Sequence, residues 1–502
     1  MNFSDWDALI NEDPDEAAKR AARTLDEDPE NALALFIIAT VYSRAERFGI
    51  AANIFTRITQ IKPERAEPWN NLGMCYTGMG DNVKARAAFK HAWSLAKTAT
   101  FAANMGMAYH AEKDHANATK WCNRALELDP NCRSAKATLG MTQLAQGQWA
   151  TGWKYNAASI GGKFRKNIQY LEEPMWEGQK GQTVVFWGEQ GLGDEIMYAS
   201  CIPDAKRECR EVILECDKRL TNLYKRSFPG VHVYGTRGQQ VEWPAKHKID
   251  ARLAVGQLPE FYRPHTSSCP GTPYLVADPE RRVQWRALLN SYGKKKIGIA
   301  WTGGSKYNKP AARAMGLEAF REIIESIDAT WVSLQYKDPS EEIAASGLPV
   351  HHWKRACETD DYDDTVALVA ELDLVISVPT TIVHTAGALG VEVHCLTHPD
   401  ADWSFRCGFP WYKSVQLFWK QDETWSKCAS RYLERFHRLR PEAAAGVQRP
   451  SAFDSPTREQ AGIHHSADSG AVAHQAPGLD GFHLQSISRA VAEQFRRPLS
   501  VS

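Results

Sequence analysis

Small residues recur in the first third of the chain at a spacing that only repeat architectures maintain. Ala39, Gly73, Gly106 and Gly140 stand 34, 33 and 34 residues apart, each inside an apolar, helix-like stretch. Small residues at such points allow paired helices to approach each other closely. A period of this length, held without insertions, predicts stacked helical hairpins in which each repeat packs only against its neighbours.

The stretches around these glycines, WNNLGMCY, FAANMGMAY and AKATLGMTQ, resemble tetratricopeptide repeats. A second set of small residues follows the first three members by twelve positions: Ala51, Ala85 and Ala118. The grooves between repeats are expected to be filled by Phe55, Phe89 and Cys122. The resemblance implies three repeats, preceded by one helix at about 6–25 and followed by a degenerate fourth repeat at about 132–158.

A repeat domain over residues 1–158 would offer a concave face to a protein or peptide partner and would do no chemistry itself. Packing against the rest of the chain, or self-association, is an equally open use of the same surface. The repeats therefore predict protein binding without naming the partner.

Composition narrows the class of protein further. The 502 residues carry 60 Lys and Arg against 60 Asp and Glu, so net charge gives no reason to expect nucleic acid or an anionic membrane as a partner. The first residues are acidic and polar, and no apolar run approaches the roughly 18 residues of a membrane span. Eleven cysteines without a C-x-x-C pair predict buried thiols. We expect a soluble, cytoplasmic protein.

From Gln182 the pattern changes to short β-branched runs that alternate with helical stretches, which predicts a parallel sheet wound on both faces. The predicted strands are 183–187, 211–216, 231–234, 296–301, 330–335, 372–377 and 391–396. A helical segment at 281–295 separates them into two groups. We therefore expect an α + α/β chain with two Rossmann-like lobes, 180–292 and 293–438, and a disordered tail at 440–502, which is rich in Ser, Ala, Gly, His and Gln.

The segment VVFWGEQGLGDEIMYA predicts a strand, a glycine turn and a helix start, an arrangement that points backbone N–H groups at an anion or polar ligand. Gly191 and Gly193 fit the start of a dinucleotide-binding G-x-G-x-x-G and Glu215 ends the next strand, but Ile196 replaces the third glycine. In the alternative, Asp194 lies in the first turn of the helix as a carboxylate that accepts a proton from a hydroxyl.

GLGDEIMYA resembles the first-lobe loop of heptosyltransferases and of their tetratricopeptide-fused relatives. The resemblance extends in order through PGTPYLVADPERRVQW, IGIAWTGG, SLQY, DDTVALVAELDLVIS, HTAGALG and FPWYKSVQLFWKQDETW, over about 260 residues. It implies a GT-B glycosyltransferase with the acceptor on the first lobe and the donor on the second, and Asp194 as the catalytic base. The repeat-plus-transferase layout is also similar to that of the protein O-linked N-acetylglucosamine transferases.

The second lobe carries the predicted donor site in SVPTTIVHTAGALG, where a strand-loop-helix turn can bind a diphosphate through backbone amides. Thr380 and Thr381 can add hydroxyl donors, and His384 lies one turn into the helix, where it could equally be a hydrogen-bonded structural histidine. Relatives usually carry an acidic residue where this chain has Pro379, a departure that favours a catalytically inactive protein.

Three further residues complete the predicted donor site. Lys306, in the loop after IGIAW, and Arg313 could reach the phosphates, although surface positions are nearly as plausible for both. Gln335 is expected to contact the base or ribose, with a structural hydrogen bond as the alternative. The acidic run Asp360, Asp361, Asp363 and Asp364 resembles a metal-binding D-x-D, but aspartates also favour a helix start. His394, Cys395 and His398 come near metal-ligand spacing and are expected to belong to a strand end and the loop after it.

These residues predict a metal-independent inverting glycosyltransferase that needs no cofactor and takes a nucleotide-sugar as co-substrate. Its acceptor would be a protein or a saccharide hydroxyl. A catalytically inactive scaffold that acts as a protein-binding adaptor, and an NAD-dependent enzyme, are the two alternatives.

Overall fold

The computed structural model describes residues 3–162, 165–168, 170–237, 239, 241–303, 314–358, 360–399, 401 and 403–439. Its contacts divide the chain into two units, one ending at Thr138 and the other beginning at Leu139. The predicted disordered tail at 440–502, together with Lys306 and Arg313, lies outside the described residues.

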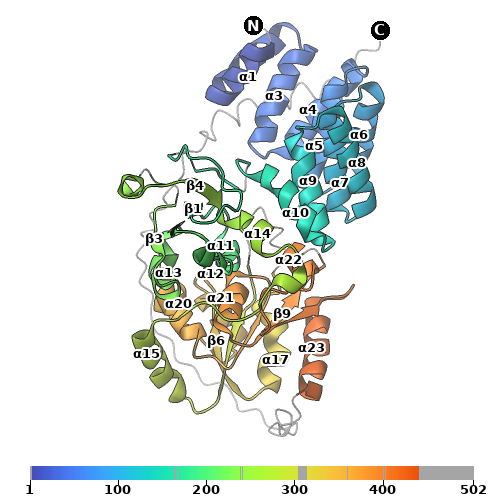
Figure 1. Cartoon of the computed structure of the whole chain (residues 1–502). Coiled ribbons are helices and arrows are strands. Elements are labelled where there is room, and N and C mark those ends of the chain that lie inside the picture. The colour runs from blue at the N-terminus through green and yellow to red at the C-terminus, as the bar shows by residue number, and fades with distance from the viewer. Residues whose placement is uncertain are drawn as a thin grey trace, which may run out of the picture. The chain divides into compact units, whose positions relative to one another are not determined.

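The first unit consists of antiparallel helices joined by short turns (Figure 1). Successive helices pack as pairs, α3 with α4, α5 with α6 and α7 with α8. The helices are α1 (Phe3–Glu12), α2 (Pro14–Glu27), α3 (Ala32–Arg44), α4 (Phe48–Ile61), α5 (Ala66–Met79), α6 (Asn82–Leu95), α7 (Ala99–Ala111) and α8 (His115–Leu128). The predicted helical hairpins are confirmed.

The small residues of the repeat do what their spacing predicts. A Cβ atom on Gly73 would lie 2.5 Å from the ring of Phe89, and one on Gly106 would lie 2.6 Å from Sγ of Cys122. Phe55, Phe89 and Cys122 are fully buried. The α5–α6 and α7–α8 hairpins can therefore close only because Gly73 and Gly106 have no side chain where Phe89 and Cys122 insert.

The helix predicted over about 6–25 is wrong in one respect, because the structure has two helices there. Asp13 separates α1 from α2, and its side chain accepts a hydrogen bond from the N–H of Glu16. Pro14 takes the first position of α2, where a missing N–H costs nothing, whereas inside a continuous helix its ring would clash with the preceding turn.

The second unit begins within α9 (Arg133–Ala145) and continues through α10 (Trp149–Asn156) to a first sheet. Its strands are all parallel and run in the order β3-β2-β1-β4. They are β1 (Thr183–Trp187), β2 (Glu211–Glu215), β3 (His232–Tyr234) and β4 (Ala251–Ala254). The accompanying helices are α11 (Leu192–Ala199), α12 (Ile202–Glu208), α13 (Thr221–Ser227) and α14 (Pro259–Tyr262). We call residues 165–292 the first lobe.

Residues 293–439, the second lobe, contain a parallel sheet in the order β10-β9-β8-β5-β6-β7. Its strands are β5 (Lys295–Ala300), β6 (Ala329–Ser333), β7 (Val350–His351), β8 (Leu374–Ser377), β9 (Val393–Thr397) and β10 (Val415–Trp419). The order reverses between β5 and β8, and in the first sheet between β1 and β4. In doubly wound sheets, ligands bind outside the carboxyl ends of the strands at such a reversal.

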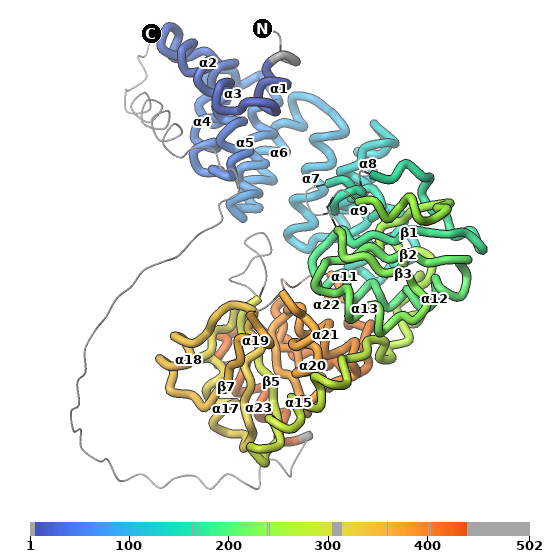
Figure 2. The backbone as a smooth tube through the Cα atoms, turned by 90° about the vertical axis from the view of Figure 1, so that its left-hand side faces the viewer, coloured from blue at the N-terminus to red at the C-terminus, as the bar shows by residue number. Residues whose placement is uncertain are grey.

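Helices cover both faces of the second sheet, as predicted. Its helices are α17 (Arg321–Ser326), α18 (Ser340–Ser346), α19 (Lys354–Cys357), α20 (Tyr362–Val369), α21 (Thr381–Leu389), α22 (Trp403–Arg406) and α23 (Trp425–Leu439). Residues of α17 and α23 share one core cluster with β5, whereas α20 and α21 pack with other strand residues in a second cluster. Figure 2 shows α15 (Pro279–Asn290), which links the lobes, beside α20.

All seven predicted strands exist, with ends displaced by at most two residues, but three further strands of the described residues were missed. Of these, β4 reads only ARLA and β7 has two residues, so neither carries a recognisable hydrophobic pattern of its own. The third, β10, is an edge strand with mostly half-exposed side chains. Pairing with a neighbouring strand, which is a tertiary effect, decides all three.

Two tryptophans one turn apart pack helix α10 against the rest of the second unit. Trp149 stacks on Trp411 with ring centres 5.4 Å apart, and Trp153 meets Trp403 edge-on at 5.3 Å. The indole N–H of Trp153 donates to the carbonyl of Arg263 at 3.1 Å. Both tryptophans are fully buried, so α10 binds the first lobe through a hydrogen bond and the second lobe through aromatic packing.

We predict that Trp153→Ala lowers the free energy of unfolding of the second unit by about 3–5 kcal/mol, because it leaves a large cavity and an unpaired carbonyl. Scanning calorimetry of the full chain measures the change. Met79→Ala, at a side chain that is 45% exposed on α5, is the control and should change stability by less than about 0.5 kcal/mol. A loss below about 1 kcal/mol for Trp153→Ala would contradict the anchoring role of α10.

Candidate functional site

The glycine turn after β1 leads directly into α11, so Asp194 lies in the first turn of the helix at the carboxyl end of the first sheet. Gly191 is the N-cap, and a Cβ atom there would lie 3.1 Å from Oδ2 of Asp194. The Asp194 carboxylate is half-buried and close to the positive end of the helix dipole, which favours its charged form.

In the second lobe, α21 begins directly after β8 in the same way. Thr380 is its N-cap residue, and Thr381 opens the helix. Within the described chain the Thr380 side chain makes no capping hydrogen bond to α21, and its Oγ1 lies 3.1 Å from Oγ of Ser377 instead. The first-turn amides of α21 are thus not capped by this threonine.

The first turns of α11 and α21 meet. A Cβ atom on Gly193 would lie 3.0 Å from Cδ2 of His384 and 3.4 Å from both Cα and Oγ1 of Thr381. Any side chain at position 193 would push α21 away. The structure therefore brings together Gly193, Thr381 and His384 from the predicted site, with Asp194 next to Gly193 on the same turn.

Two tyrosines that the sequence analysis did not place in the site connect these helices. Tyr274 donates its hydroxyl to the carbonyl of Ile196 in α11 at 2.6 Å, and its oxygen lies 3.3 Å from Oη of Tyr412. Oη of Tyr412 in turn lies 3.5 Å from Nδ1 of His384. Burial raises the pKa of Tyr274, and burial together with the nearby Asp194 carboxylate raises the pKa of Tyr412, so both stay neutral hydrogen-bond donors.

His384 itself is buried among aromatic rings. Phe405 and Phe409 lie with ring centres 6.0 and 5.4 Å from its imidazole. The predicted contact of His384 with a donor substrate stays a prediction, because the same ring also serves as part of this packed cluster.

Gln335 occupies the carboxyl end of β6, beside the loop that follows β5. Its Nε2 donates to Oγ1 of Thr302, and its Oε1 accepts from the N–H of Thr302 at 3.4 Å. The structural hydrogen bond considered in the sequence analysis is therefore present. It fixes the start of the loop that carries Lys306 and Arg313, which both lie outside the described residues.

A carboxylate that the sequence analysis did not assign is buried behind Asp194. Glu195 is 1% exposed and accepts hydrogen bonds from Nη1 of Arg237 at 2.8 Å and from the N–H of Asp217 at 2.9 Å. Burial raises the pKa of Glu195 to about 7, although Arg237 and the Asp217 N–H both act to lower it. Its position inside the GLGDE motif, next to Asp194, was the available signal.

Glu189, on the same glycine turn, is a second buried acid. Its Oε1 accepts from Nη2 of Arg165 at 2.9 Å and from Nε2 of Gln190 at 3.0 Å. The ion pair with Arg165 is almost completely shielded from solvent. Buried pairs of this kind give little net stability but are costly to break, so they hold the turn after β1 in one geometry.

The structure speaks against the dinucleotide alternative. Its acid, Glu215, is buried and accepts hydrogen bonds from the hydroxyls of Tyr170 and Thr236. Burial also raises the pKa of Glu215. A ribose could use this carboxylate only by displacing one of these internal partners.

The acidic run begins a helix, as expected. Asp361 is the N-cap of α20 and accepts from the N–H of Asp363. Asp363 pairs with Arg226 of the first lobe at 2.5 Å, and Asp364 accepts from the indole of Trp285 at 2.9 Å. These contacts join the lobes and occupy the carboxylates that a D-x-D motif would offer.

His394 and Cys395 lie within β9, where the sequence analysis placed the end of a strand. Nδ1 of His394 is 2.7 Å from Oη of Tyr432. Most of the eleven cysteines are buried, as predicted.

The repeat unit contains a row of side-chain amides that spans two repeats. Nδ2 of Asn104 on α7 donates to Oδ1 of Asn70 on α5 at 2.8 Å, and Nδ2 of Asn70 donates to Oδ1 of Asn71 at 3.3 Å. Asn71 and Asn104 are half-buried. Amides carry both donors and acceptors, so those with remaining capacity could pair with the backbone of an extended peptide.

Comparison with known proteins establishes the repeats. Residues 66–98 and 99–132 match one profile of the tetratricopeptide repeat, and residues 6–66 match a second. The chain therefore contains tetratricopeptide repeats, a module that suggests a protein partner. Among the described helices none is long and apolar enough to cross a membrane.

Protein FlbA of Caulobacter vibrioides is 26% identical over 446 residues, which cover 81% of this chain and 72% of that protein. Among solved structures, MamA is 19% identical. The match covers 32% of this chain and 93% of the MamA chain, with a TM-score of 0.28. PilW, a type IV pilus biogenesis factor, is 22% identical with coverages of 30% and 71% and a TM-score of 0.29. Such low scores support no functional argument.

The raised pKa of Glu195 predicts a specific pH dependence. Its folded-state pKa of about 7 lies above the ordinary value of 4.5, so the folded state binds more protons and stability falls as pH rises between these values. The integrated loss is about 3 kcal/mol. Glu195→Gln cannot titrate, so its free energy of unfolding relative to the wild type should rise by about this amount from pH 4.5 to 7. Urea denaturation at several pH values measures both free energies of unfolding, and the same pH dependence for the two proteins would contradict this prediction.

Proposed function

We propose that the second unit is a metal-independent inverting glycosyltransferase of the GT-B type, which moves a sugar from a nucleotide-sugar to a hydroxyl acceptor. The observation that carries the proposal is the meeting of α11 and α21 at Gly193, Thr381 and His384. It places a half-buried carboxylate on one helix near an N-terminus that suits an anion on the other. Both helices start at the carboxyl ends of parallel strands, where doubly wound sheets bind ligands.

In this proposal Asp194 acts as the general base. It takes the proton of the acceptor hydroxyl while the acceptor oxygen forms a bond to the anomeric carbon. The bond from that carbon to the diphosphate breaks in the same step, and the electron pair leaves with the diphosphate. A single displacement of this kind inverts the configuration of the anomeric carbon.

The leaving diphosphate would be stabilised by the second lobe. The first-turn N–H groups of α21 form the positive end of its helix dipole, and the hydroxyls of Thr380 and Thr381 add hydrogen-bond donors. Lys306 and Arg313 would supply positive charge from the loop after Gly303, and Gln335 would contact the base or ribose. Backbone and cationic donors together make a divalent ion unnecessary for this step.

The tetratricopeptide repeats would bind a protein partner or a protein acceptor. The amide row of Asn70, Asn71 and Asn104 supports an extended peptide as the bound form, because side-chain amides can replace the hydrogen bonds of a peptide backbone. The name FlbA states no activity, so the proposal rests on this chain's own residues.

A thermal-shift screen of the full chain against UDP, GDP, ADP, CMP and NAD tests donor binding. One nucleoside diphosphate should raise the melting temperature, since saturation at 100 times the dissociation constant adds about 2.7 kcal/mol of stability. A shift with NAD alone would favour a dehydrogenase instead.

Asp194→Asn tests the chemical step. Loss of the general base should lower turnover of the donor and acceptor by about 10²- to 10⁴-fold and leave nucleotide binding intact. The matched control is Asp328→Asn, at an exposed carboxylate before the amino end of β6, which should keep full activity. Loss of both turnover and nucleotide binding in Asp194→Asn would overturn the assignment of Asp194 as the base.

The second candidate is an inactive transferase-like scaffold that serves as an adaptor. Pro379 favours it, because this buried residue stands where related transferases usually carry an acid. It predicts no shift with any nucleotide in the screen, while peptides still bind the repeats.

Peptide binding can be tested separately. Peptides selected by display on the full chain should bind Asn104→Ala at least about fivefold more weakly, since one side-chain amide contact is worth roughly 1 kcal/mol. Fluorescence anisotropy measures the affinity. Leu128→Ala, at an exposed position on α8, is the control, and equal affinity of the wild type and Asn104→Ala would exclude the amide row as the binding site.

A further inference from the structure

The amino ends of β2 and β3 place two potential metal ligands on one face of the first sheet. His232 pairs with Ile213 in the parallel register, and Glu211 precedes Ile213 by two residues. Side chains two apart on a strand share a face, as do paired residues on neighbouring strands. Glu211 and His232 therefore project from the same face at the same edge.

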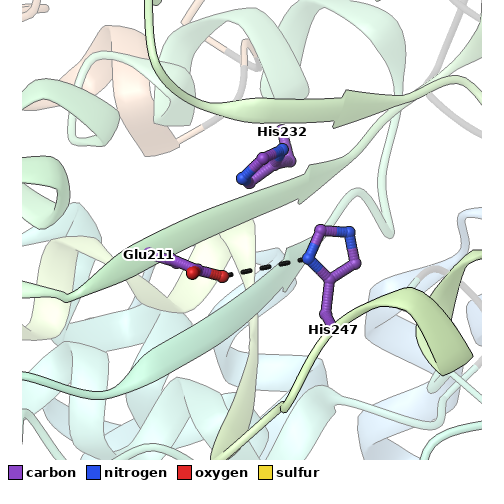
Figure 3. Close-up of side chains that lie close together, drawn as sticks. All are labelled: Glu211, His232 and His247. Carbon is purple, nitrogen blue, oxygen red and sulfur yellow. Dashed lines mark ion pairs between the residues drawn. The ribbon is translucent and has the colours of Figure 1, made fainter.

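A third ligand comes from the segment that packs over this face. His247 follows the short helix Trp243–Lys246, and its Nδ1 lies 3.9 Å from Oε2 of Glu211 (Figure 3). The rings of His232 and His247 have centres 4.8 Å apart. One ligand atom from each of Glu211, His232 and His247 lies within 4.8 Å of the other two.

The imidazole of His247 is held in the orientation that a metal ligand needs. Its Nε2 lies 2.8 Å from Oη of Tyr234, and the Tyr234 ring stacks on Trp243 at 4.7 Å with an interplanar angle of 6°. Donation of Nε2–H to the tyrosine hydroxyl would leave Nδ1, the nitrogen that faces Glu211, with its lone pair available. Metal-bound histidines commonly hold their second nitrogen by a hydrogen bond of this kind.

We propose that Glu211, His232 and His247 form a binding site for a divalent transition-metal ion such as Zn²⁺, with water completing a tetrahedral shell. Two imidazoles and one carboxylate are a ligand set that zinc uses. Bonds of about 2.1 Å put tetrahedral ligands about 3.4 Å apart, so the present spacing needs only small rotations. The Glu211 side chain is 44% exposed and is free to rotate toward the ion.

The proposed metal site is separate from the candidate transfer site. Glu211 begins β2, whereas Glu215, at the carboxyl end toward Asp217 and α11, lies about 13 Å away along the strand. An ion at Glu211 would tie β2 and β3 to the segment around His247, so its role would be to stabilise the first lobe or to regulate it.

A second group, Asp338, His352 and Glu358, also brings three ligand atoms together. It contains one imidazole, and Nζ of Lys354 already lies 3.1 Å from Oδ2 of Asp338. The positive charge of Lys354 next to the Asp338 carboxylate disfavours binding of a metal cation there. This group therefore serves as the matched control rather than as a competing site.

The test is a titration of the full, chelator-treated chain with Co²⁺, whose absorption reports geometry and ligand type. We expect one tightly bound ion per chain, visible bands typical of tetrahedral coordination, and no thiolate-to-cobalt charge-transfer band in the near ultraviolet. Zn²⁺ should displace Co²⁺ and raise the melting temperature.

Variants separate the proposed site from other binding. His232→Asn and Glu211→Gln, both at exposed positions that should not impair folding, are expected to weaken Co²⁺ binding at least tenfold. Tyr234→Phe keeps the stacking on Trp243 and should weaken binding roughly tenfold through the lost orientation of His247. His352→Asn should leave the affinity unchanged.

Three results would overturn the proposal. The first is the absence of tight Co²⁺ binding to the wild type. The second is binding that survives in a His232→Asn, His247→Asn double variant whose circular dichroism matches that of the wild type. The third is a thiolate charge-transfer band, which would assign the ion to cysteines.

Discussion

The close approach of α11 and α21 is the contact on which the candidate site depends. In each of the two parallel sheets, one of these helices follows the carboxyl end of a strand. Their first turns can touch because Gly193 has no side chain that would collide with Thr381 and His384 of α21. The Tyr274 and Tyr412 hydroxyls lie within hydrogen-bonding reach across the same junction. The chemistry proposed for Asp194 is therefore a property of the lobe contact, and neither lobe contains the whole site.

Buried carboxylates paired with arginines fix the elements around this contact. Arg226 pairs with Asp363 across the lobes, and Arg165 and Arg237 neutralise the acids of the glycine turn. Such pairs must recover a large desolvation cost, so their main contribution is to specify one arrangement rather than to add stability. Aspartates that looked like metal ligands in the sequence are used for this purpose.

Local patterns predicted most of the fold. The repeat period, the β-branched runs and the GLGD turn each depend on neighbours in sequence, and each led to the correct element. The break at Pro14 was readable but was passed over, whereas β4 and β7 depend on strand pairing that no local pattern carries. Alternation within a strand is local, but Glu211 and His232 share a face only through the pairing of β2 with β3. The arrival of His247 beside them is not local either, because loop packing brings it there.

The tryptophans of α10 limit where recombination can divide a gene that encodes a chain of this kind. A gene segment that encoded only residues from the first sheet onward would produce lobes whose surface at Trp403 and Trp411 lacks its cover, and whose Arg263 carbonyl lacks its donor. Such a product would expose aromatic rings and tend to aggregate. Recombination that preserves the α/β part must therefore keep α10 with it, although the sequence analysis assigned this helix to a degenerate fourth repeat.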